Sequence, residues 1–368
     1  MIRFLSRRRS RATARRSSVG ADPLADGDQA LGAAEDLVAN EKLADAIRLL
    51  TEANRRRRDT RIEKRIVDLR FEAFKQRDWR RENPVVPDEV EDLFPNERIP
   101  AISRERLTVE QLRSGITHHG SLIVRGLANQ DQVNQLTTDI DKTFIAFDAQ
   151  ADGVHRSDLA GWFEPFRQNR GSNRTLKRKR GAVLAVDSPP TLFDLIEAFD
   201  ARGVGHLARD YFGEPPTMLA KKVTLRRMPR DARTGGWHQD GSFMGAGIIS
   251  LNVWLSLSHC GDNAPGLDVV GRRLEELVPM GDGAFADWGV KPQVAEQVAA
   301  GEIVRPIFEP GDALLLDHLT LHRTAVDAGM DNDRYAIETW LFAPSTYDAM
   351  TAKGGQEYEP RDQLPILY

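Results

Sequence analysis

The sequence predicts a mainly β fold, a sandwich or a barrel, with flanking helices. Beyond Ile116 the chain consists of short extended runs rich in Val, Leu, Ile and aromatic residues, and Gly and Pro separate these runs. The runs do not alternate regularly with helices, which disfavours a doubly wound parallel sheet. Between about Asp28 and Trp79 the apolar residues recur at helical spacing, so we expect an added α-helical region at the N-terminal side.

Residues 1–25 are expected to form a basic disordered arm. The opening "MIRFLSRRRSRATARRSSVG" is rich in Arg and Ser and contains no acidic residue. This composition is typical of a basic arm and equally of an organelle transit peptide, so organelle targeting stays open. A secretory signal is disfavoured because no apolar segment follows the arginines.

Residues 26–80 are expected to form a helical region of two or three short helices. Apolar residues at helical spacing include Leu43, Ile47 and Leu50, and later Ile62, Ile66 and Leu69. We favour an amphipathic cap on the main domain over a partner-binding repeat, since no second copy of the unit is found. Residues 81–115 contain prolines and acidic residues and are expected to be a linker. Because every candidate ligand lies beyond residue 237, residues 28–79 are expected to be dispensable for metal chemistry.

Residues 116–345 are expected to form the main domain, followed by a C-terminal tail, residues 346–368. The expected strands are "SLIVRGL", "GAVLAV", "MLAKKVTLRRM", "GIISLNVWLSL", "EIVRPIF", "DALLLDHLTLH" and "RYAIETWLF". The segment "NQDQVNQLTTDIDKTF" is expected to be a helix, with Val133, Leu136 and Ile140 on one face. In "EPGD", Pro310 and Gly311 suit the central positions of a type II turn, which predicts a hairpin-like connection into "ALLLDHLTLH".

The composition of the chain limits the class of protein to which it can belong. A hydrophobic fraction of 40% and a charged fraction of 29% are typical of a soluble globular protein. No run of about 18 apolar residues occurs, so no membrane span is expected. The single cysteine, Cys260, excludes an internal disulfide and favours a reducing compartment, so a cytoplasmic location is expected. The net charge of −4 argues against nucleic acid as a partner.

The segment "GGWHQDGSF" places a histidine and a carboxylate two positions apart. In an extended chain His238 and Asp240 point to one side and Gln239 to the other. This pair could be two metal ligands, an acid–base pair or two polar residues facing water. H-x-D alone is too short to decide.

Two further features narrow the choice. In "DHLTLHRT", His318 and His322 share one face if the strand is regular, and Thr324 continues that face. Arg334 follows His322 by 12 positions and begins the next strand, so its guanidinium can point into the same cavity and bind a carboxylate with two hydrogen bonds. Taken alone, Arg334 could be a surface residue. The combination of H-x-D, a distal His and this Arg is typical of a two-histidine, one-carboxylate iron site.

The order and spacing of these residues resemble the Fe(II)/2-oxoglutarate-dependent dioxygenases, and within them the phytanoyl-CoA dioxygenase (PhyH-like) family. The segments "WHQD", "NVWLSL", "GDALLLDHLTLHRT" and "RYAIETW" carry the resemblance, which covers roughly residues 116–345. It implies a double-stranded β-helix core, which is a jelly-roll, cupin-like fold. It also implies Fe(II) as the metal, 2-oxoglutarate as the co-substrate, and O2 with a small molecule as the other substrates.

The resemblance also implies roles for individual residues. His238, Asp240 and His322 would ligate Fe(II), and Arg334 would pair with the distal carboxylate of 2-oxoglutarate. Thr324 would reach the same carboxylate. Trp254 would lie near the co-substrate, although it could equally be an aromatic residue of the core. His322 rather than His318 fits the spacing of the family. Asp317 and His318 are expected to support the site, while His259 and Cys260 resemble no ligand arrangement.

The expected activity is hydroxylation of an aliphatic carbon of a small organic substrate, for which an anionic group stays open. Related halogenases have a small residue in place of the carboxylate, and this chain keeps Asp240. The basic segment "FRQNRGSNRTLKRKRG", residues 166–181, could attract an anionic substrate, although a solvated charge run is the commoner explanation. Two alternatives remain: a catalytically silent cupin-like binding protein with a helical assembly region, and a dioxygenase that acts on a nucleic-acid-type polymer.

Overall fold

The computed structural model of the chain describes residues 26–76, 89–167, 173–220, 222–245, 247–281, 284, 286–349 and 365–368. The chain divides into two compact units, Met1–Asp59 and Thr60–Tyr368. This boundary falls inside the stretch 26–80 that the sequence presents as one helical region. The expected basic arm, residues 1–25, lies outside the described residues. Among the helices of the described residues, none has both the length and the apolar character needed to cross a bilayer.

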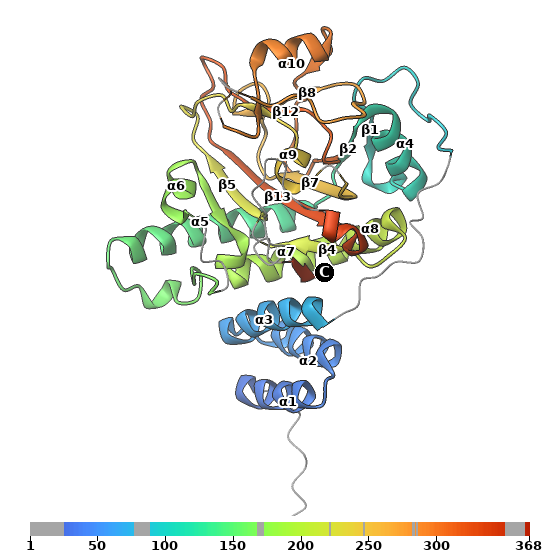
Figure 1. The fold of residues 1–368 in the computed structure, drawn as a ribbon. Coiled ribbons are helices and arrows are strands. Elements are labelled where there is room, and N and C mark those ends of the chain that lie inside the picture. Colours follow the sequence, from blue (N-terminus) through green and yellow to red (C-terminus); the bar gives the residue numbers. More distant parts are fainter. Residues whose placement is uncertain are drawn as a thin grey trace, which may run out of the picture. The chain divides into compact units, whose positions relative to one another are not determined.

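The first unit is a pair of helices, α1 (Gly27–Ala39) and α2 (Leu43–Arg56) (Figure 1). The side chain of Asp26 accepts a hydrogen bond from the Asp28 amide and so caps the start of α1. The buried faces contain mainly small side chains, among them Ala30, Ala34 and Ala46. Small residues allow two helices to approach closely, which explains why α1 and α2 pair with few large apolar side chains.

The second unit contains the remaining helices. They are α3 (Thr60–Gln76), α4 (Val109–His119), α5 (Gln130–Ala151), α6 (Arg174–Lys179), α7 (Pro189–Ala201), α8 (Val204–Phe212), α9 (Gly241–Met244) and α10 (Pro292–Ala299), with short 3-10 turns at Arg104–Arg106, Ser157–Leu159, Ala185–Asp187 and Pro344–Ala349. The start of α5 is fixed by a capping box, in which Asn129 and Gln132 each bond to the other's backbone amide. Val133, Leu136 and Ile140 are buried on one face of α5, which confirms the helix expected there.

The strands of the second unit form two sheets. The nine-stranded sheet has the order β1-β2-β11-β7-β13-β4-β14, with β5 also paired to β13 and β3 paired to β5; the five-stranded sheet has the order β10-β8-β12-β6-β9. The bounds are β1 (Ala101–Ser103), β2 (Ser121–Arg125), β3 (Ala182–Leu184), β4 (Thr217–Leu219), β5 (Thr224–Met228), β6 (Trp237–His238), β7 (Ser250–Ser256), β8 (Gly266–Val270), β9 (Gly289–Val290), β10 (Ile303–Val304), β11 (Ala313–Leu316), β12 (His322–Ala325), β13 (Arg334–Phe342) and β14 (Pro365–Leu367). All pairs are antiparallel except β1 with β2.

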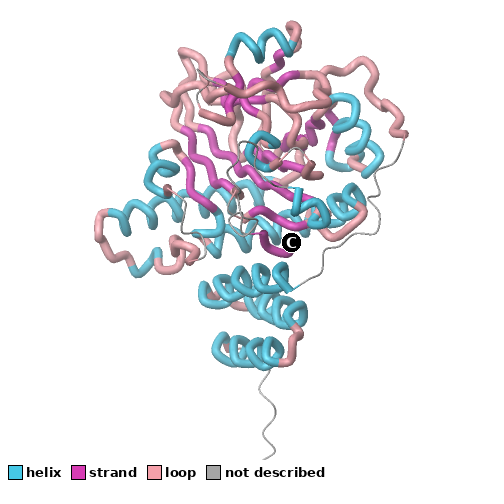
Figure 2. Tube along the Cα trace, viewed as in Figure 1, coloured by secondary structure: helices cyan, strands magenta, loops and turns pink. Residues whose placement is uncertain are grey.

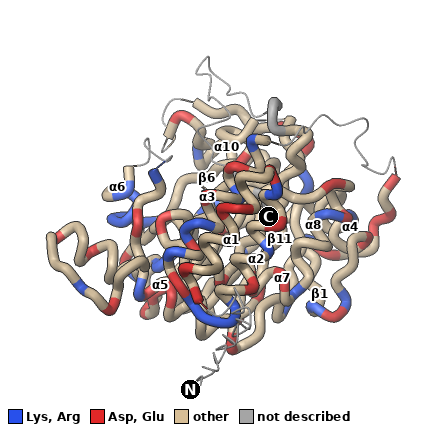
Figure 3. The backbone as a smooth tube through the Cα atoms, turned by 90° about the horizontal axis from the view of Figure 1, so that it is seen from below, with Lys and Arg blue, Asp and Glu red and all other residues tan. Residues whose placement is uncertain are grey.

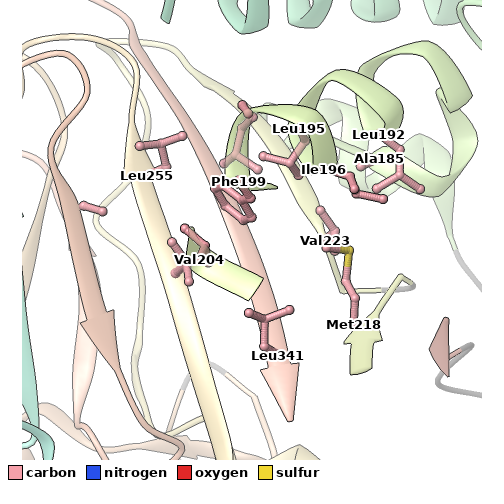
Figure 4. Close-up of a cluster of buried hydrophobic side chains, with 14 of the residues drawn as sticks. Ala185, Leu192, Leu195, Ile196, Phe199, Val204, Met218, Val223, Leu255 and Leu341 are labelled. Atoms are coloured by element: carbon pink, nitrogen blue, oxygen red, sulfur yellow. The ribbon is translucent and has the colours of Figure 1, made fainter. Parts of the chain in front are cut away.

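The larger hydrophobic core lies between the nine-stranded sheet and the helices α4, α5, α7 and α8 (Figure 2). Figure 4 shows Leu195 and Phe199 of α7 together with Leu255 of β7 and Leu341 of β13. Successive residues of a strand face opposite sides, so the other residues of β7 and β13 face away from these helices. That second face is the inner face of the fold.

The two sheets pack against each other through the inner face. One buried cluster joins Leu267 and Val269 of β8 to Trp254 of β7, Leu314 of β11 and Ala336 of β13. The fold is therefore mainly β, with two facing sheets and flanking helices, as expected for a double-stranded β-helix. Arg334, Glu338 and Trp340 alternate along β13 on this inner face, and so line the space between the sheets.

The expected type II turn is confirmed, although the connection is not a hairpin. The Asp312 amide donates to the Glu309 carbonyl (3.0 Å), and Gly311 has a φ of 95°. A Cβ at Gly311 would lie 2.3 Å from the Ala128 carbonyl oxygen, so a larger residue is excluded there. The strands before and after the turn, β10 and β11, belong to different sheets and do not pair with each other. The turn therefore carries the chain from one sheet to the other.

Three expectations are corrected. The expected linker 81–115 contains β1 and most of α4, and the expected tail 346–368 ends in β14, which pairs with β4. The expected single strand "DALLLDHLTLH" is broken, because it leaves the nine-stranded sheet after Leu316 and enters the five-stranded sheet at His322. The Asp317 carboxylate causes the break by accepting a hydrogen bond from the Leu319 amide (2.9 Å), which forms a local turn.

The basic segment 166–181 is partly helical. Residues 168–172 lie outside the described residues, and α6 follows them, with its basic residues drawn in blue in Figure 3. Two of its cations form ion pairs inside the protein, Arg174 with Asp187 (2.7 Å) and Arg178 with Asp148 (2.6 Å). These two arginines therefore stabilise the fold, and their charge is less available to an external anion.

Deletion of residues 1–59 is expected to leave metal binding intact, whereas deletion of residues 1–76 is expected to unfold the second unit. Helix α3 belongs to that unit, where it packs on β14 and α7, and Val67 and Phe71 are part of its core. Burial of each such side chain stabilises by about 1.5–3 kcal/mol. Circular dichroism and Mn(II) titration of both truncations provide the test. Loss of metal binding in a folded 60–368 chain would contradict it.

Candidate metal centre

Three side chains from two sheet strands and a helix start meet between the sheets. His238 ends β6 and lies directly opposite His322 of β12 in the register, and Asp240 is the N-cap of α9. One ligand atom from each of these residues lies within 4.8 Å of the others. The segment is not the continuous strand expected from its sequence, since Asp240 has helical dihedral angles (φ −62°, ψ −30°). The helical turn nevertheless directs its carboxylate toward the two histidines.

Hydrogen bonds orient both histidine rings through the same nitrogen, Nδ1. The Nδ1 atom of His238 lies 3.0 Å from the Gly236 carbonyl oxygen, and Nδ1 of His322 lies 3.0 Å from the Thr320 carbonyl oxygen. A carbonyl oxygen can only accept, so Nδ1 of each ring carries the proton and Nε2 has the lone pair. This arrangement orients an imidazole for metal binding through Nε2.

The carboxylate of Asp240 is prepared in the same way. Its Oδ2 atom accepts a hydrogen bond from the Asn252 side-chain amide (3.1 Å), while its Oδ1 atom is buried without a hydrogen-bond partner in the described part of the chain. The Oδ1 atom lies 3.9 Å from His238 Nε2. A buried carboxylate oxygen without a partner is costly, and a cation between the three side chains would remove that cost.

Without a metal ion, burial disfavours a charge on the side chains of the ligand group. Burial lowers the pKa of His238 to about 3, helped by neighbouring His322, and burial raises the pKa of Asp240 to about 6. Both shifts favour uncharged side chains. A divalent cation has the opposite effect on the carboxylate because it stabilises the ionised form, so metal binding and proton release are coupled.

Arg334 lies on the same inner face, fully buried at the start of β13. Its Nη1 atom donates to the Gly266 carbonyl oxygen (2.9 Å), but its Nε and Nη2 atoms have no hydrogen-bond partner in the described residues. The indole of Trp254 lies beside it, with the guanidinium carbon 5.4 Å from the ring centroid, and its Nε1 atom also lacks a partner there. These unused donors are suited to a carboxylate.

Glu338 connects this arginine to the metal-ligand group. The Glu338 carboxylate accepts two hydrogen bonds from Arg226 (2.8 and 3.0 Å), and the nearby positive charges of Arg226 and then of Arg334 lower the pKa of Glu338 against the effect of burial. His238 also acts on Glu338 electrostatically. Glu338 therefore lies within electrostatic reach of both ends of the inner space. Nothing in the sequence pairs Arg226 with Glu338, although the alternation of Arg334, Ala336 and Glu338 along β13 indicates a shared face.

The other candidate residues have different positions. Thr324 lies on β12 two residues after His322, next to Ala325, which pairs with Gly266, the residue whose carbonyl binds Arg334. His318 is not part of the ligand group, and its carbonyl oxygen accepts a hydrogen bond from the Gly241 amide (2.8 Å). Asp317 forms an ion pair with Arg273 and organises the turn before β12.

Gln239, between the two candidate ligands, is a buried structural residue, which no motif of the sequence indicates. Its side-chain amide donates to the carbonyl oxygens of Leu319 (2.7 Å) and Glu276 (3.1 Å), and its Oε1 atom accepts from the Val278 amide (2.7 Å). It thereby ties the turn before β12 and the 276–278 segment to the chain between His238 and Asp240. Alternation from His238, the last residue of β6, predicts that the Gln239 side chain points away from that ligand.

Gln239→Leu is expected to lower the free energy of unfolding by about 2–4 kcal/mol, because the Leu319 carbonyl and the Val278 amide, both buried, and the partly buried Glu276 carbonyl lose their partner. Urea denaturation followed by circular dichroism measures the change. Gln130→Leu, at an exposed position at the start of α5, is the matched control and should change stability by about 0.5 kcal/mol or less. Equal effects of the two substitutions would contradict the structural role of Gln239.

No protein-family model and no curated protein sequence matches this chain. Among solved structures, the chain is similar to EctD from S. alaskensis with 2-oxoglutarate and 5-hydroxyectoine, at 17% identity and a TM-score of 0.46, covering 73% of this chain and 83% of that one. It is also similar to EvdO2 from Micromonospora carbonacea complexed with 2-oxoglutarate, at 18% identity and a TM-score of 0.40, covering 63% and 89%. At these values the similarity supports no argument about function. The argument about function rests on the residues of this chain.

Proposed function

We propose that this chain is a non-haem Fe(II)- and 2-oxoglutarate-dependent dioxygenase of the PhyH-like type that hydroxylates an aliphatic carbon of a small organic substrate. One observation carries the proposal: two sets of buried polar atoms that have no hydrogen-bond partner within the described part of the chain share the inner face. Asp240 Oδ1 belongs to the group of three candidate ligands, and the Nε and Nη2 atoms of Arg334 are unused donors. The first set fits a cation and the second fits a carboxylate.

Each group has identifiable ligands in this arrangement. His238 Nε2, His322 Nε2 and an Asp240 oxygen would hold Fe(II), which prefers imidazole and carboxylate ligands and keeps further coordination positions open. Arg334 would bind the distal carboxylate of 2-oxoglutarate, with Trp254 Nε1 and Thr324 as further donors. When bound, the iron and the co-substrate supply oxygen activation coupled to oxidative decarboxylation of 2-oxoglutarate.

The protein's own contribution is orientation and exclusion of water. The Gly236 and Thr320 carbonyls fix the histidine rings, and Asn252 holds the Asp240 carboxylate. The side chains of Asp240 and Arg334 are almost completely buried, whereas that of His238 is 22% exposed. A substrate would therefore approach from the side of His238.

Cys260, buried and free, is consistent with a reducing cytoplasmic environment.

The test is succinate release by purified protein supplied with Fe(II), 2-oxoglutarate and O2, with a screen of small organic compounds as substrates. We expect slow succinate release without substrate, faster release with an accepted substrate, and none from Asp240→Asn, which keeps the shape of the side chain and removes its charge. A folded protein that binds metal but neither binds nor consumes 2-oxoglutarate would support the alternative, a catalytically silent binding protein.

A further inference from the structure

Two neighbouring side chains on the inner face, Asn252 of β7 and Trp340 of β13, offer polar atoms to a further ligand. They lie directly opposite each other in the register of the nine-stranded sheet. Both face the inner space, because Trp254 and Ala336 of the inner cluster lie two and four residues from them along the same strands. The Cβ atoms of such an opposite pair are about 5 Å apart, so one small group can contact both side chains.

Each of these side chains has a buried polar atom that is not used by the protein. Asn252 is 5% exposed and Trp340 is 7% exposed. The Oδ1 atom of Asn252 and the Nε1 atom of Trp340 have no hydrogen-bond partner within the described residues. A buried polar atom without a partner is costly, and a bound group that pairs with it removes that cost.

The contact between Asn252 and Asp240 places this pair of atoms beside the metal-ligand group. Asn252 Nδ2 donates to Asp240 Oδ2 (3.1 Å). An ionised carboxylate can only accept, so the amide nitrogen of Asn252 must face Asp240 and the amide oxygen must be the unused atom. Because both atoms are bonded to the same carbon, Asn252 Oδ1 lies close to a candidate metal ligand.

The indole of Trp340 connects the pair to an apolar surface, the aromatic cluster of Phe243, Trp288 and Trp340. Phe243 stacks on Trp340, with 5.1 Å between the ring centroids, and meets Trp288 edge to face at 5.2 Å. The ring of Trp288 also lies edge to face with that of His238, at 5.3 Å. Phe243 and Trp288 are partly exposed. The aromatic cluster therefore extends from the partly exposed side of His238 to the buried indole of Trp340.

The two unused atoms together select an uncharged group. Trp340 Nε1 can only donate a hydrogen bond, and Asn252 Oδ1 can only accept one. A carboxylate cannot donate to the Asn252 oxygen, and an ammonium group cannot accept from the indole. A ketone oxygen pairs with the indole alone. A hydroxyl group donates and accepts through one atom, which suits two side chains at directly opposite positions of a sheet.

We propose that Asn252 Oδ1 and Trp340 Nε1 bind a hydroxyl group of the substrate, and that the aromatic cluster holds its apolar remainder. The substrate class is then a small apolar alcohol. The hydroxyl group is held beside Asp240, so the carbons next to it lie nearest the metal centre. The inference rests on the proposed function, because iron and 2-oxoglutarate would supply the oxidation of those carbons.

The test uses three probes of nearly equal shape and different hydrogen-bonding capacity: cyclohexanol, cyclohexanone and cyclohexylamine, which is a cation at neutral pH. The full-length protein is loaded with Mn(II) and 2-oxoglutarate. Bound Mn(II) enhances the relaxation of nearby probe protons, so a titration gives the affinity of probes that bind beside the metal, without turnover. We expect cyclohexanol to bind about tenfold more tightly than either other probe, because each of those leaves one buried atom unpaired.

Two substitutions distinguish the donor from the acceptor, with Mn(II) kept saturating. Asn252→Leu removes the acceptor, so the affinity for cyclohexanol should fall about tenfold, to that of cyclohexanone, and cyclohexanone should be unaffected. Trp340→Phe keeps an aromatic ring and removes the donor. Cyclohexanol and cyclohexanone should then both weaken about tenfold, so that the preference for the alcohol survives.

Trp162→Phe is the matched control for the loss of an indole N–H. Trp162 lies over Lys142 of α5, and α5 packs on the other face of the nine-stranded sheet. This substitution should leave the affinities of all three probes unchanged.

The outcomes separate this subsite from the proposed function. Failure of the wild-type protein to bind Mn(II) or 2-oxoglutarate, measured first, would contradict the proposed function and with it the subsite. Normal binding of both, with equal affinities for cyclohexanol and cyclohexanone, would overturn the subsite alone, and this comparison does not depend on the folding of any variant. The subsite is also wrong if Asn252→Leu, folded by circular dichroism, keeps the wild-type preference for the alcohol.

Discussion

His322→Ala is expected to abolish metal binding, whereas His318→Ala is expected to preserve it. His322 Nε2 belongs to the three-residue ligand group, and its orientation is fixed by the bond from Nδ1 to the Thr320 carbonyl. Removing one of three protein ligands should weaken metal binding by about 100-fold or more, since loss of even an indirect supporting contact costs about 10–100-fold. Succinate release should disappear with it.

His318→Ala is the matched control because both histidines belong to the same segment and both are largely buried, each with 9% exposure. The hydrogen bond from Gly241 goes to the backbone carbonyl of His318, so it survives the substitution. The ring of His318 packs near Gly241, and its loss should lower stability by about 1–2 kcal/mol without removing a ligand. Co(II) titration, with circular dichroism to verify folding, measures both variants. Metal loss in His318→Ala with retention in His322→Ala would reverse the assignment.

The contrast between these two histidines shows what periodicity cannot predict. A regular strand would place His318 and His322 on one face, and nothing in the alternation of side chains distinguishes them. The structure separates them by a turn that depends on the Asp317 carboxylate and by a change of sheet. At such a turn, a hydrogen bond between a side chain and the backbone competes with the hydrogen bonds of the strand. The apolar pattern of the sequence does not reveal this competition.

Other features were predictable because they depend on neighbours in the sequence. The run "RYAIETWLF" coincides with β13, and Gly311 occupies the positive-φ position of its turn. The aromatic cluster of Phe243, Trp288 and Trp340 was not predictable, because these residues come from segments far apart in the chain and meet only in the folded state. Helix α3 was assigned to a separate region for the same reason, since a helical pattern indicates a buried face but not what covers it.

Arg334→Met is expected to remove 2-oxoglutarate binding, leave metal binding intact and raise the stability of the ligand-free protein. Arg334 is fully buried, and burial lowers its pKa, yet the guanidinium remains charged at neutral pH. Only its Nη1 atom is satisfied, by the Gly266 and Pro265 carbonyls, so Nε and Nη2 are buried donors of a charged group that have no partner within the described residues. Such a group destabilises the protein until an anion binds it.

The two effects of this substitution have opposite signs, which distinguishes a ligand-binding arginine from a structural one. Loss of a buried, hydrogen-bonded charge pair should weaken 2-oxoglutarate by about 2–5 kcal/mol, which corresponds to about thirtyfold or more in Kd. Removal of the unsatisfied charge should stabilise the ligand-free protein by about 1–4 kcal/mol. A structural arginine would instead lower stability when replaced, and would change 2-oxoglutarate affinity only through unfolding.

Arg323→Met, on the outer side of β12, is the matched control. Arg323 binds Asp268 (2.8 Å), which also binds Arg305 (2.7 Å), so its replacement leaves Asp268 with one cation. It alternates with His322 along β12 and therefore faces away from the inner space. Thermal unfolding with and without 2-oxoglutarate, in the presence of Mn(II), measures all three proteins. The co-substrate should raise Tm in the wild type and in Arg323→Met and have no effect in Arg334→Met, because only a ligand that binds the native state stabilises it. A Tm increase of wild-type size in Arg334→Met would place the carboxylate of 2-oxoglutarate on another residue.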